Sequence, residues 1–196
     1  MENKPKQYIG YLIGSICHSK EREHAFDASE RAVTEAGHLA LNPVKEEPEK
    51  TGMSCSDTES KLSSLWSTGQ FAEYKKLMDA IWVKDLENIR RADYLVLHFE
   101  HNDSSVGAPL EMTIASLSYI NKLMQTSCGE EEAAMLKVGK YCYEHAGYRL
   151  KPIYWVCQGP ISDINTTLKW LVLIGSDVRV FKTYKDLTEF LRETYK

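Results

Sequence analysis

The chain has 196 residues, of which 43% are hydrophobic and 27% are charged, and its formal net charge is −4. This length and composition predict a single globular domain, and the negative charge argues against a nucleic-acid polymer as partner. No apolar run reaches the roughly 18 residues of a membrane span, and the first residues lack the apolar core of a signal peptide, so we expect no membrane partner.

Five cysteines are scattered along the chain, and none forms a C-x-x-C pair. An odd number without paired spacing predicts free thiols in a reducing cytoplasm. For each cysteine we expect the role of a small buried hydrophobic residue rather than a redox role.

The first part of the chain predicts a strand–helix–strand unit. Residues 7–13 are rich in strand-forming residues and end at Gly14, and a polar loop follows. Apolar residues then recur with helical period over 21–36, and a short strand over 38–43 ends at a proline. This order predicts parallel strands joined by helical crossovers.

Residues 44–70 are rich in Ser, Thr, Glu, Gly and Pro and predict an irregular insertion, with at most a short helical turn around residues 62–66. A binding loop or lid and a mobile surface insertion are equally good interpretations. The nearby aromatic residues Trp66, Phe71 and Tyr74 are candidates for stacking on a planar ligand, although ordinary core packing is favoured for each of them.

The rest of the chain predicts alternating elements: helices over 71–92, from about 109, over 130–146 within an extra helical segment at about 122–150, over 160–176 and over 184–195, with strands over 93–99, 151–157 and 177–181. We therefore predict one α/β domain over residues 1–196. Its core is a doubly wound, Rossmann-like, mainly parallel five-stranded sheet with flanking helices.

Two loops at the ends of predicted strands carry unusual chemistry. GSICHSKE follows the first strand, and EHNDSSVGA follows the apolar run DYLVLHF. Open parallel sheets bind ligands beyond the carboxyl ends of their strands. Glycines let the backbone approach an anion, and helix N-termini supply N–H donors, so the two loops together predict an anion-binding site.

Asp85 is a candidate functional carboxylate because it lies four residues after Ile81 and four before Ile89, on the apolar side of its helix. A carboxylate on that side is costly unless it has partners or opens into a cleft. A bond to a neighbouring backbone amide is the simpler interpretation. We favour a functional one, because this helix leads into the strand whose exit loop precedes Glu111.

Glu111 falls at about the third residue of its predicted helix, where the helix dipole favours an ionised carboxylate. Taken alone, a glutamate at this position is more often a structural helix-capping residue. His98 and His101 flank the second loop, but no third ligand accompanies them at metal-binding spacing. We expect neither a metal ion nor a cofactor.

Three motifs resemble the nucleoside 2-deoxyribosyltransferase superfamily, and within it the 2′-deoxynucleoside 5′-monophosphate N-hydrolases. They are YLIGSI at 11–16, KDLENIRRADYLVLHFE at 84–100 and SVGAPLEMTIA at 105–115. Their order and spacing fit the family over roughly the first 120 residues, apart from the insertion.

The resemblance implies that Glu111 is the nucleophile that attacks the anomeric carbon of the sugar, while Asp85 holds the base or protonates it as it leaves. The transition state is then oxocarbenium-like, and a second step transfers the sugar to water or to another base, as in a retaining glycosidase. It also implies a homodimer or higher homo-oligomer.

The residue two positions before Gly107 bears on the substrate. The transferases usually have an aspartate there, which binds a free 5′-hydroxyl, whereas this chain has Ser105, as in the monophosphate hydrolases. A serine donates to a phosphate that an aspartate would repel. The implied substrate-binding residues are Gly14, Ser15, Ile16, Asp103, Ser105 and Gly107.

Two departures from the family pattern leave alternatives open. Cys17 stands where the hydrolases tend to have an arginine, and Asp103 is placed to bind a hydroxyl in the manner of the transferases. The leading hypothesis is an N-glycosidase that hydrolyses a (deoxy)nucleoside 5′-monophosphate to free base and sugar phosphate. A transferase that exchanges bases between deoxynucleosides and a non-catalytic nucleotide sensor on the same fold are the alternatives.

Overall fold

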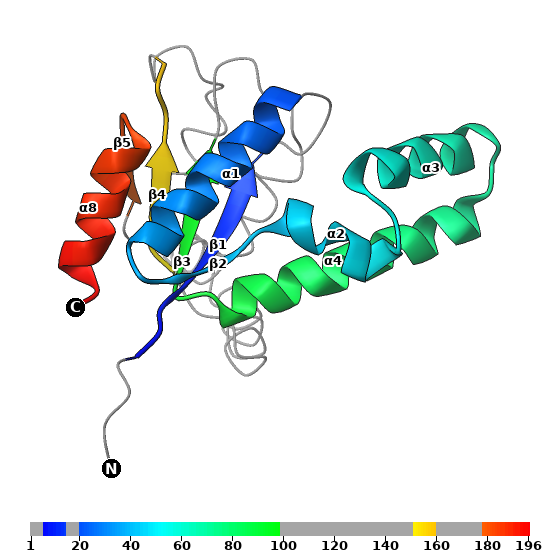
Figure 1. Cartoon of the computed structure of the whole chain (residues 1–196). Coiled ribbons are helices and arrows are strands. Elements are labelled where there is room, and N and C mark those ends of the chain that lie inside the picture. Colours follow the sequence, from blue (N-terminus) through cyan, green and yellow to red (C-terminus); the bar gives the residue numbers. More distant parts are fainter. Residues whose placement is uncertain (1–5, 15–19, 99–150, 160–177) are drawn as a thin grey trace, which may run out of the picture.

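The computed structural model describes residues 6–14, 20–98, 151–159 and 178–196, which contain a five-stranded, all-parallel sheet (Figure 1). The strand order is β2-β1-β3-β4-β5. The bounds are β1 Ile9–Gly14, β2 Leu39–Leu41, β3 Tyr94–His98, β4 Ile153–Val156 and β5 Val178–Phe181. The predicted α/β fold with a five-stranded parallel sheet is confirmed.

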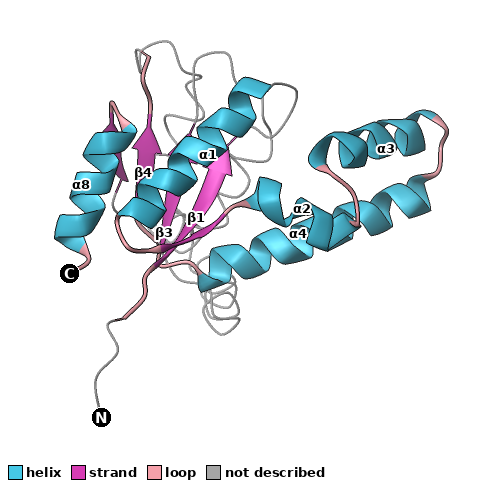
Figure 2. Cartoon of the chain, in the orientation of Figure 1, coloured by secondary structure: helices cyan, strands magenta, loops and turns pink. Residues whose placement is uncertain are grey.

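Helices flank this sheet (Figure 2), and the described part of the chain contains α1 Lys20–Glu35, α2 Pro43–Thr51, α3 Cys55–Ser67, α4 Phe71–Arg91 and α8 Tyr184–Thr194. Along the order of the sheet, the chain moves from β1 to the edge strand β2 and then back past β1 to β3, so these two crossovers run in opposite directions. Because such crossovers are right-handed, α1 and α4 lie on opposite faces of the sheet. The helices predicted from about 109, over 130–146 and over 160–176 lie outside the described residues.

The prediction of an irregular insertion over 44–70 is wrong, because this segment forms α2 and α3. Asn42 caps α2 through its side chain, Pro43 occupies its first turn, and Gly52 ends it in the left-handed conformation at φ 73°. Ser54 caps α3 in the same way. The polar residues that predicted a loop are largely helix caps and exposed helix surface.

The core on the α1 and α8 face of the sheet is apolar and rich in aromatic side chains. Its fully buried members are Leu12, Phe26, Ala32, Val33, Tyr94, Val96, Tyr154, Val156, Leu187 and Leu191. The Tyr154 and Tyr195 hydroxyls lie 2.7 Å apart, so the segment after α8 is anchored to β4. This packing makes the sheet a rigid support for the loops at its carboxyl edge.

Candidate functional site

The carboxyl ends of β1 and β3 lie side by side, because the strand register pairs Gly14 with His98. β2 and β3 lie on opposite sides of β1. The connection that leaves β1 therefore runs toward β2, whereas the connection that leaves β3 runs toward β4, in the opposite direction. In open α/β sheets such a topological switch point is where ligands bind. The two loops predicted to bind an anion leave the sheet from these neighbouring strand ends.

Gly14 has a packing reason to be glycine. A Cβ atom at this position would lie 3.1 Å from the His98 carbonyl oxygen and 3.1 Å from Cζ of Phe26 on α1. The missing side chain therefore lets α1 pack closely over the end of β1. Its predicted part in a phosphate site stays a prediction.

His98 is tied to two helices at the same edge of the sheet. Its Nδ1 lies 2.6 Å from the Tyr184 hydroxyl, which also donates to the Ala25 carbonyl oxygen at 3.3 Å. These contacts join β3, α8 and α1 at the rim. Sequence reasoning considered His98 only as a metal ligand and missed this role, although a histidine that ends an otherwise apolar strand is a usable signal.

Asp85 lies on the core-facing side of α4, as its spacing predicted. Only 4% of its surface is exposed, and Asn88 and Ile89 on the same side of the helix are buried as well. A crossover helix returns the chain from the carboxyl to the amino edge of a parallel sheet. Asp85 lies about 9 Å along the helix before its last residue, Arg91, and is therefore displaced toward the carboxyl edge.

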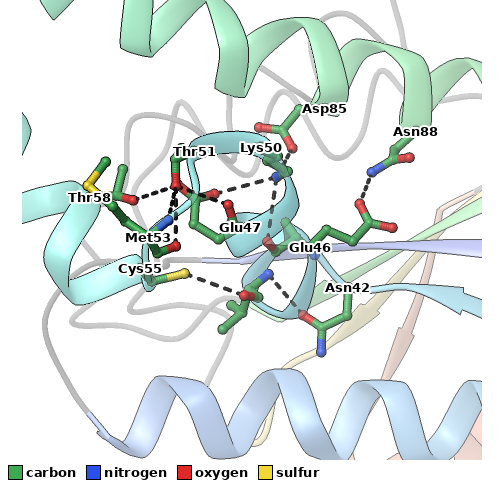
Figure 3. Close-up of polar contacts among 12 residues, drawn as sticks. Asn42, Glu46, Glu47, Lys50, Thr51, Met53, Cys55, Thr58, Asp85 and Asn88 are labelled. Atoms are coloured by element: carbon green, nitrogen blue, oxygen red, sulfur yellow. Dashed lines mark hydrogen bonds and ion pairs between the residues drawn. The ribbon is translucent and has the colours of Figure 1, made fainter.

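The partner of Asp85 is a buried lysine from α2, not the backbone amide of the simpler interpretation (Figure 3). Nζ of Lys50 lies 2.8 Å from Oδ1 of Asp85, and the Lys50 side chain is only 1% exposed. The same ammonium lies 3.5 Å from the Pro43 carbonyl oxygen and 3.7 Å from a carboxylate oxygen of Glu47. Because the segment was predicted to be irregular, sequence reasoning missed Lys50 and Glu47.

Glu47 is a second buried carboxyl group beside the same lysine. Burial raises the pKa of Glu47, and the nearby Asp85 charge adds to this shift, while the Lys50 ammonium and a hydrogen bond with Thr58 oppose it. One ammonium thus serves two carboxyl groups. Burial therefore makes the protonated form of Glu47 more favourable than it is for an exposed glutamate.

The lysine contact bears on the chemistry of Asp85. Oδ1 of Asp85 accepts a hydrogen bond from the Lys50 ammonium at 2.8 Å, so this carboxyl group is positioned as an acceptor. Of the two roles that the resemblance implies for Asp85, holding the base fits this contact better than protonating it.

A second polar contact joins α2 to α4 one turn farther along. The Asn88 side-chain amide donates to Glu46, and Asn88 is fully buried. The Asn88 side-chain oxygen has no hydrogen-bond partner among the described residues. The interface between the two helices is therefore largely polar in spite of its burial.

An open hollow of about 320 Å³ lies between α2, α3 and α4, and Lys50 is among the residues that line it. A larger hollow of about 430 Å³ lies between α1 and α8, where Arg31, Glu35 and Glu189 are among its lining residues. No predicted site residue lines the larger hollow. Lys50 belongs to the lining of the smaller hollow, but its side chain is only 1% exposed, so its ammonium is covered by protein and faces Asp85 rather than the hollow.

Of the three aromatic residues near the turn between α3 and α4, Trp66 and Phe71 are not ordinary core, which corrects the favoured interpretation, and Tyr74 is half-buried. Trp66 is 61% exposed and Phe71 is 57% exposed. The Trp66 ring meets the rings of Phe71 and Tyr74 edge-on, at 5.2 Å between centroids in both cases. They form a small surface cluster where α3 and the start of α4 extend away from the sheet (Figure 1).

Most of the predicted site residues fall outside the described part of the chain, and their predicted roles stay predictions. These residues are Ser15, Ile16, Asp103, Ser105, Gly107 and Glu111.

Within the residues that the structure describes, no group of three or more His, Cys, Asp or Glu side chains is placed to hold a metal ion. No helix in the same part of the chain is long and apolar enough to cross a membrane. Comparison of the sequence with known protein families and with curated proteins finds no match.

Proposed function

We propose that this chain is an N-glycosidase that releases the base from a nucleoside 5′-monophosphate. The proposal rests on the three motifs that resemble the 2′-deoxynucleoside 5′-monophosphate N-hydrolases. One structural observation supports it: a buried carboxylate, Asp85, is held in place on the helix that leads into β3, whose carboxyl end lies beside Gly14 at the switch point of the sheet.

In the proposed reaction the Glu111 carboxylate forms a bond to the anomeric carbon while the glycosidic C–N bond breaks. The bonding electron pair leaves with the base, which takes up a proton from solvent, and the water that attacks in the second step returns a proton to solvent. Water then cleaves the glycosyl ester and regenerates Glu111, so the configuration at the sugar is retained. Asp85 accepts a hydrogen bond from the base and orients it during the first step.

The 5′-phosphate is proposed to bind at the ends of β1 and β3, where Gly14, Ser15, Ser105 and Gly107 belong to the two predicted loops. Backbone N–H groups and serine hydroxyls donate hydrogen bonds to phosphate oxygens without adding negative charge. The proposal includes action in the cytoplasm as a homo-oligomer, which rests on the unpaired cysteines and on the resemblance.

The test is to incubate the pure protein with a panel of ribo- and deoxyribonucleosides and their 5′-monophosphates and to measure free base by chromatography. Base release from the monophosphates that is lost in Glu111→Ala is the expected result. If a second free base is supplied and a new nucleoside forms without net hydrolysis, the chain is instead a transferase. If nucleotide binds but no base is released, and Glu111→Ala changes nothing, it is a sensor.

A further inference from the structure

The side of α4 that faces away from α3 carries a stripe of exposed and half-buried side chains, here called the outer stripe. Its members recur at intervals of three and four residues and therefore share one side of the helix: Phe71, Ala72, Lys75, Asp79, Trp82 and Val83. Leu77 and Ala80 line the hollow toward α3 and belong to the other side.

The apolar part of the outer stripe is large for a solvent-facing helix surface. Phe71 is 57% exposed and Val83 is 67% exposed, while Trp82 is half-buried. Phe71 also contacts the exposed Trp66 where α3 and the start of α4 extend away from the sheet (Figure 1). Contiguous exposed apolar side chains that include aromatic rings are typical of an interaction surface.

The charges on the outer stripe indicate which partner fits it. Lys75 and Asp79 form an ion pair in the middle of the stripe, and their side chains are 75% and 57% exposed. The stripe thus has no net charge, and the whole chain has a net charge of −4. An anionic lipid surface or a nucleic-acid backbone would need a basic surface instead.

A second copy of the chain presents the same two charges in reverse order when the two α4 helices run antiparallel. A two-fold axis at the level of Leu77 places Lys75 of each copy opposite Asp79 of the other, because each lies two residues from position 77. Parallel helices in register would instead bring like charges together. The charges therefore favour the antiparallel arrangement and its register.

The apolar members of the stripe match under the same symmetry. Phe71 of each copy lies beside Trp82 of the other, because they lie six residues before and five residues after position 77. Ala72 lies beside Val83 of the other copy for the same reason. Exposed ion pairs contribute little free energy, so these apolar contacts supply most of the affinity and the charges supply the orientation.

We propose that α4 pairs antiparallel with α4 of a second copy through the outer stripe, forming a two-fold symmetric dimer. This dimer does not depend on the reaction proposed for the edge of the sheet.

The experiment measures the dimer dissociation constant of the full-length protein by sedimentation velocity over a concentration series. Lys75→Glu should raise this constant by about tenfold or more, because it sets two acidic groups against each other at both symmetric contacts. Adding Asp79→Lys reverses both charges and should restore the wild-type constant. The matched control is Lys185→Glu, with and without Glu189→Lys, because this pair on α8 has the same spacing and exposure but lies outside the stripe. Neither control should change the constant.

A second pair of variants tests the apolar contacts. Val83→Ser should raise the dissociation constant by about tenfold, because two valines per dimer lose their apolar burial. Val180→Ser is the control, since Val180 is 41% exposed on β5 and lies outside the stripe. It should leave the constant unchanged. Both valines are exposed, so these variants keep the fold, which circular dichroism checks.

A wild-type protein that stays monomeric throughout the series would overturn the inference, as would a dimer that neither Lys75→Glu nor Val83→Ser weakens. Failure of Asp79→Lys to rescue Lys75→Glu would overturn the antiparallel register. A monomer that binds vesicles containing phosphatidylserine would assign the stripe to a lipid surface instead. A monomer that releases base would keep the proposed function and remove the interface, and a dimer that releases none would do the reverse.

Discussion

Lys50 and Asp85 lie 35 residues apart in the sequence, and their side chains form a buried ion pair with 2.8 Å between Nζ and Oδ1. The pair joins α2 to α4 and holds Asp85 in place, the residue that the motifs predict to contact the substrate. Removing two charges from water is costly, and such a pair is maintained only while both partners are present.

Loss of the lysine should therefore destabilise the fold strongly. Lys50→Met leaves Asp85 buried without a cation, which costs about 3–5 kcal/mol in the free energy of unfolding, measured by urea denaturation. Asp85→Leu in the Lys50→Met background should recover part of this loss, because it removes the unpaired charge. Lys75→Met should change stability by less than about 0.5 kcal/mol, since Lys75 is exposed. A Lys50→Met variant as stable as Lys75→Met would contradict the buried pair.

Glu47 should make stability fall as the pH rises. Because burial raises the pKa of Glu47 in the folded state, the folded protein holds more protons than the unfolded chain at pH values above 4.5, the ordinary pKa of the group. Its contribution is therefore most favourable below 4.5 and is lost as the pH passes through the raised pKa. The slope is at most about 1.4 kcal/mol per pH unit.

The matched variant is Glu47→Gln, which keeps the shape of the side chain but does not titrate. Urea denaturation of both proteins between pH 4 and pH 7 should show that the stability of wild type relative to Glu47→Gln declines across this range. Parallel pH profiles for the two proteins would mean that Glu47 has no shifted pKa.

Gly14→Ala separates the packing role of this glycine from its predicted role at a phosphate. The added Cβ would press on the Phe26 ring and on the His98 carbonyl oxygen, at 3.1 Å from each, so we expect a loss of about 1–3 kcal/mol in stability. Phe26→Leu in the Gly14→Ala background should relieve part of the strain. If thermal denaturation shows no loss but phosphate binding is impaired, close approach to the ligand explains the glycine instead.

Substitution of the two proposed site carboxylates should affect catalysis differently. Glu111→Ala removes the nucleophile and should lower the rate of base release by about 10⁴-fold or more. Asp85→Asn keeps the shape of the side chain but weakens acceptance of a hydrogen bond, so we expect the value of kcat to fall by about 10²-fold with little change in KM. An unchanged kcat in Asp85→Asn would exclude Asp85 from the mechanism.

The sheet was predictable because its signals are local. The nearly continuous apolar run at 93–99 is what a strand buried on both faces requires, and Tyr94–His98 is the central β3. The burial of Asp85 was likewise predictable, because helical spacing from Ile81 and Ile89 determines which side of α4 it occupies.

The partner of Asp85 was not predictable in this way. Lys50 lies in a segment whose serines, glycines and prolines indicated a loop. In the structure, Gly52 and Ser54 cap the two helices, while Pro48 and the other serines lie within them. Side chains that cap a helix also favour turns, so composition alone does not separate the two. The contact between His98 and Tyr184, 86 residues apart, was missed for a related reason, since no local pattern encodes it.

The sequence by itself determined the order of the five strands along the chain, the parallel sheet and the side of α4 on which a carboxylate is buried. Each of these follows from periodicity and from chain connectivity over short distances. The tertiary structure alone decided that Lys50 pairs with Asp85 and that Glu47 shares this lysine. These features depend on how α2, α3 and α4 pack together, and packing is a property of elements that are distant in the sequence.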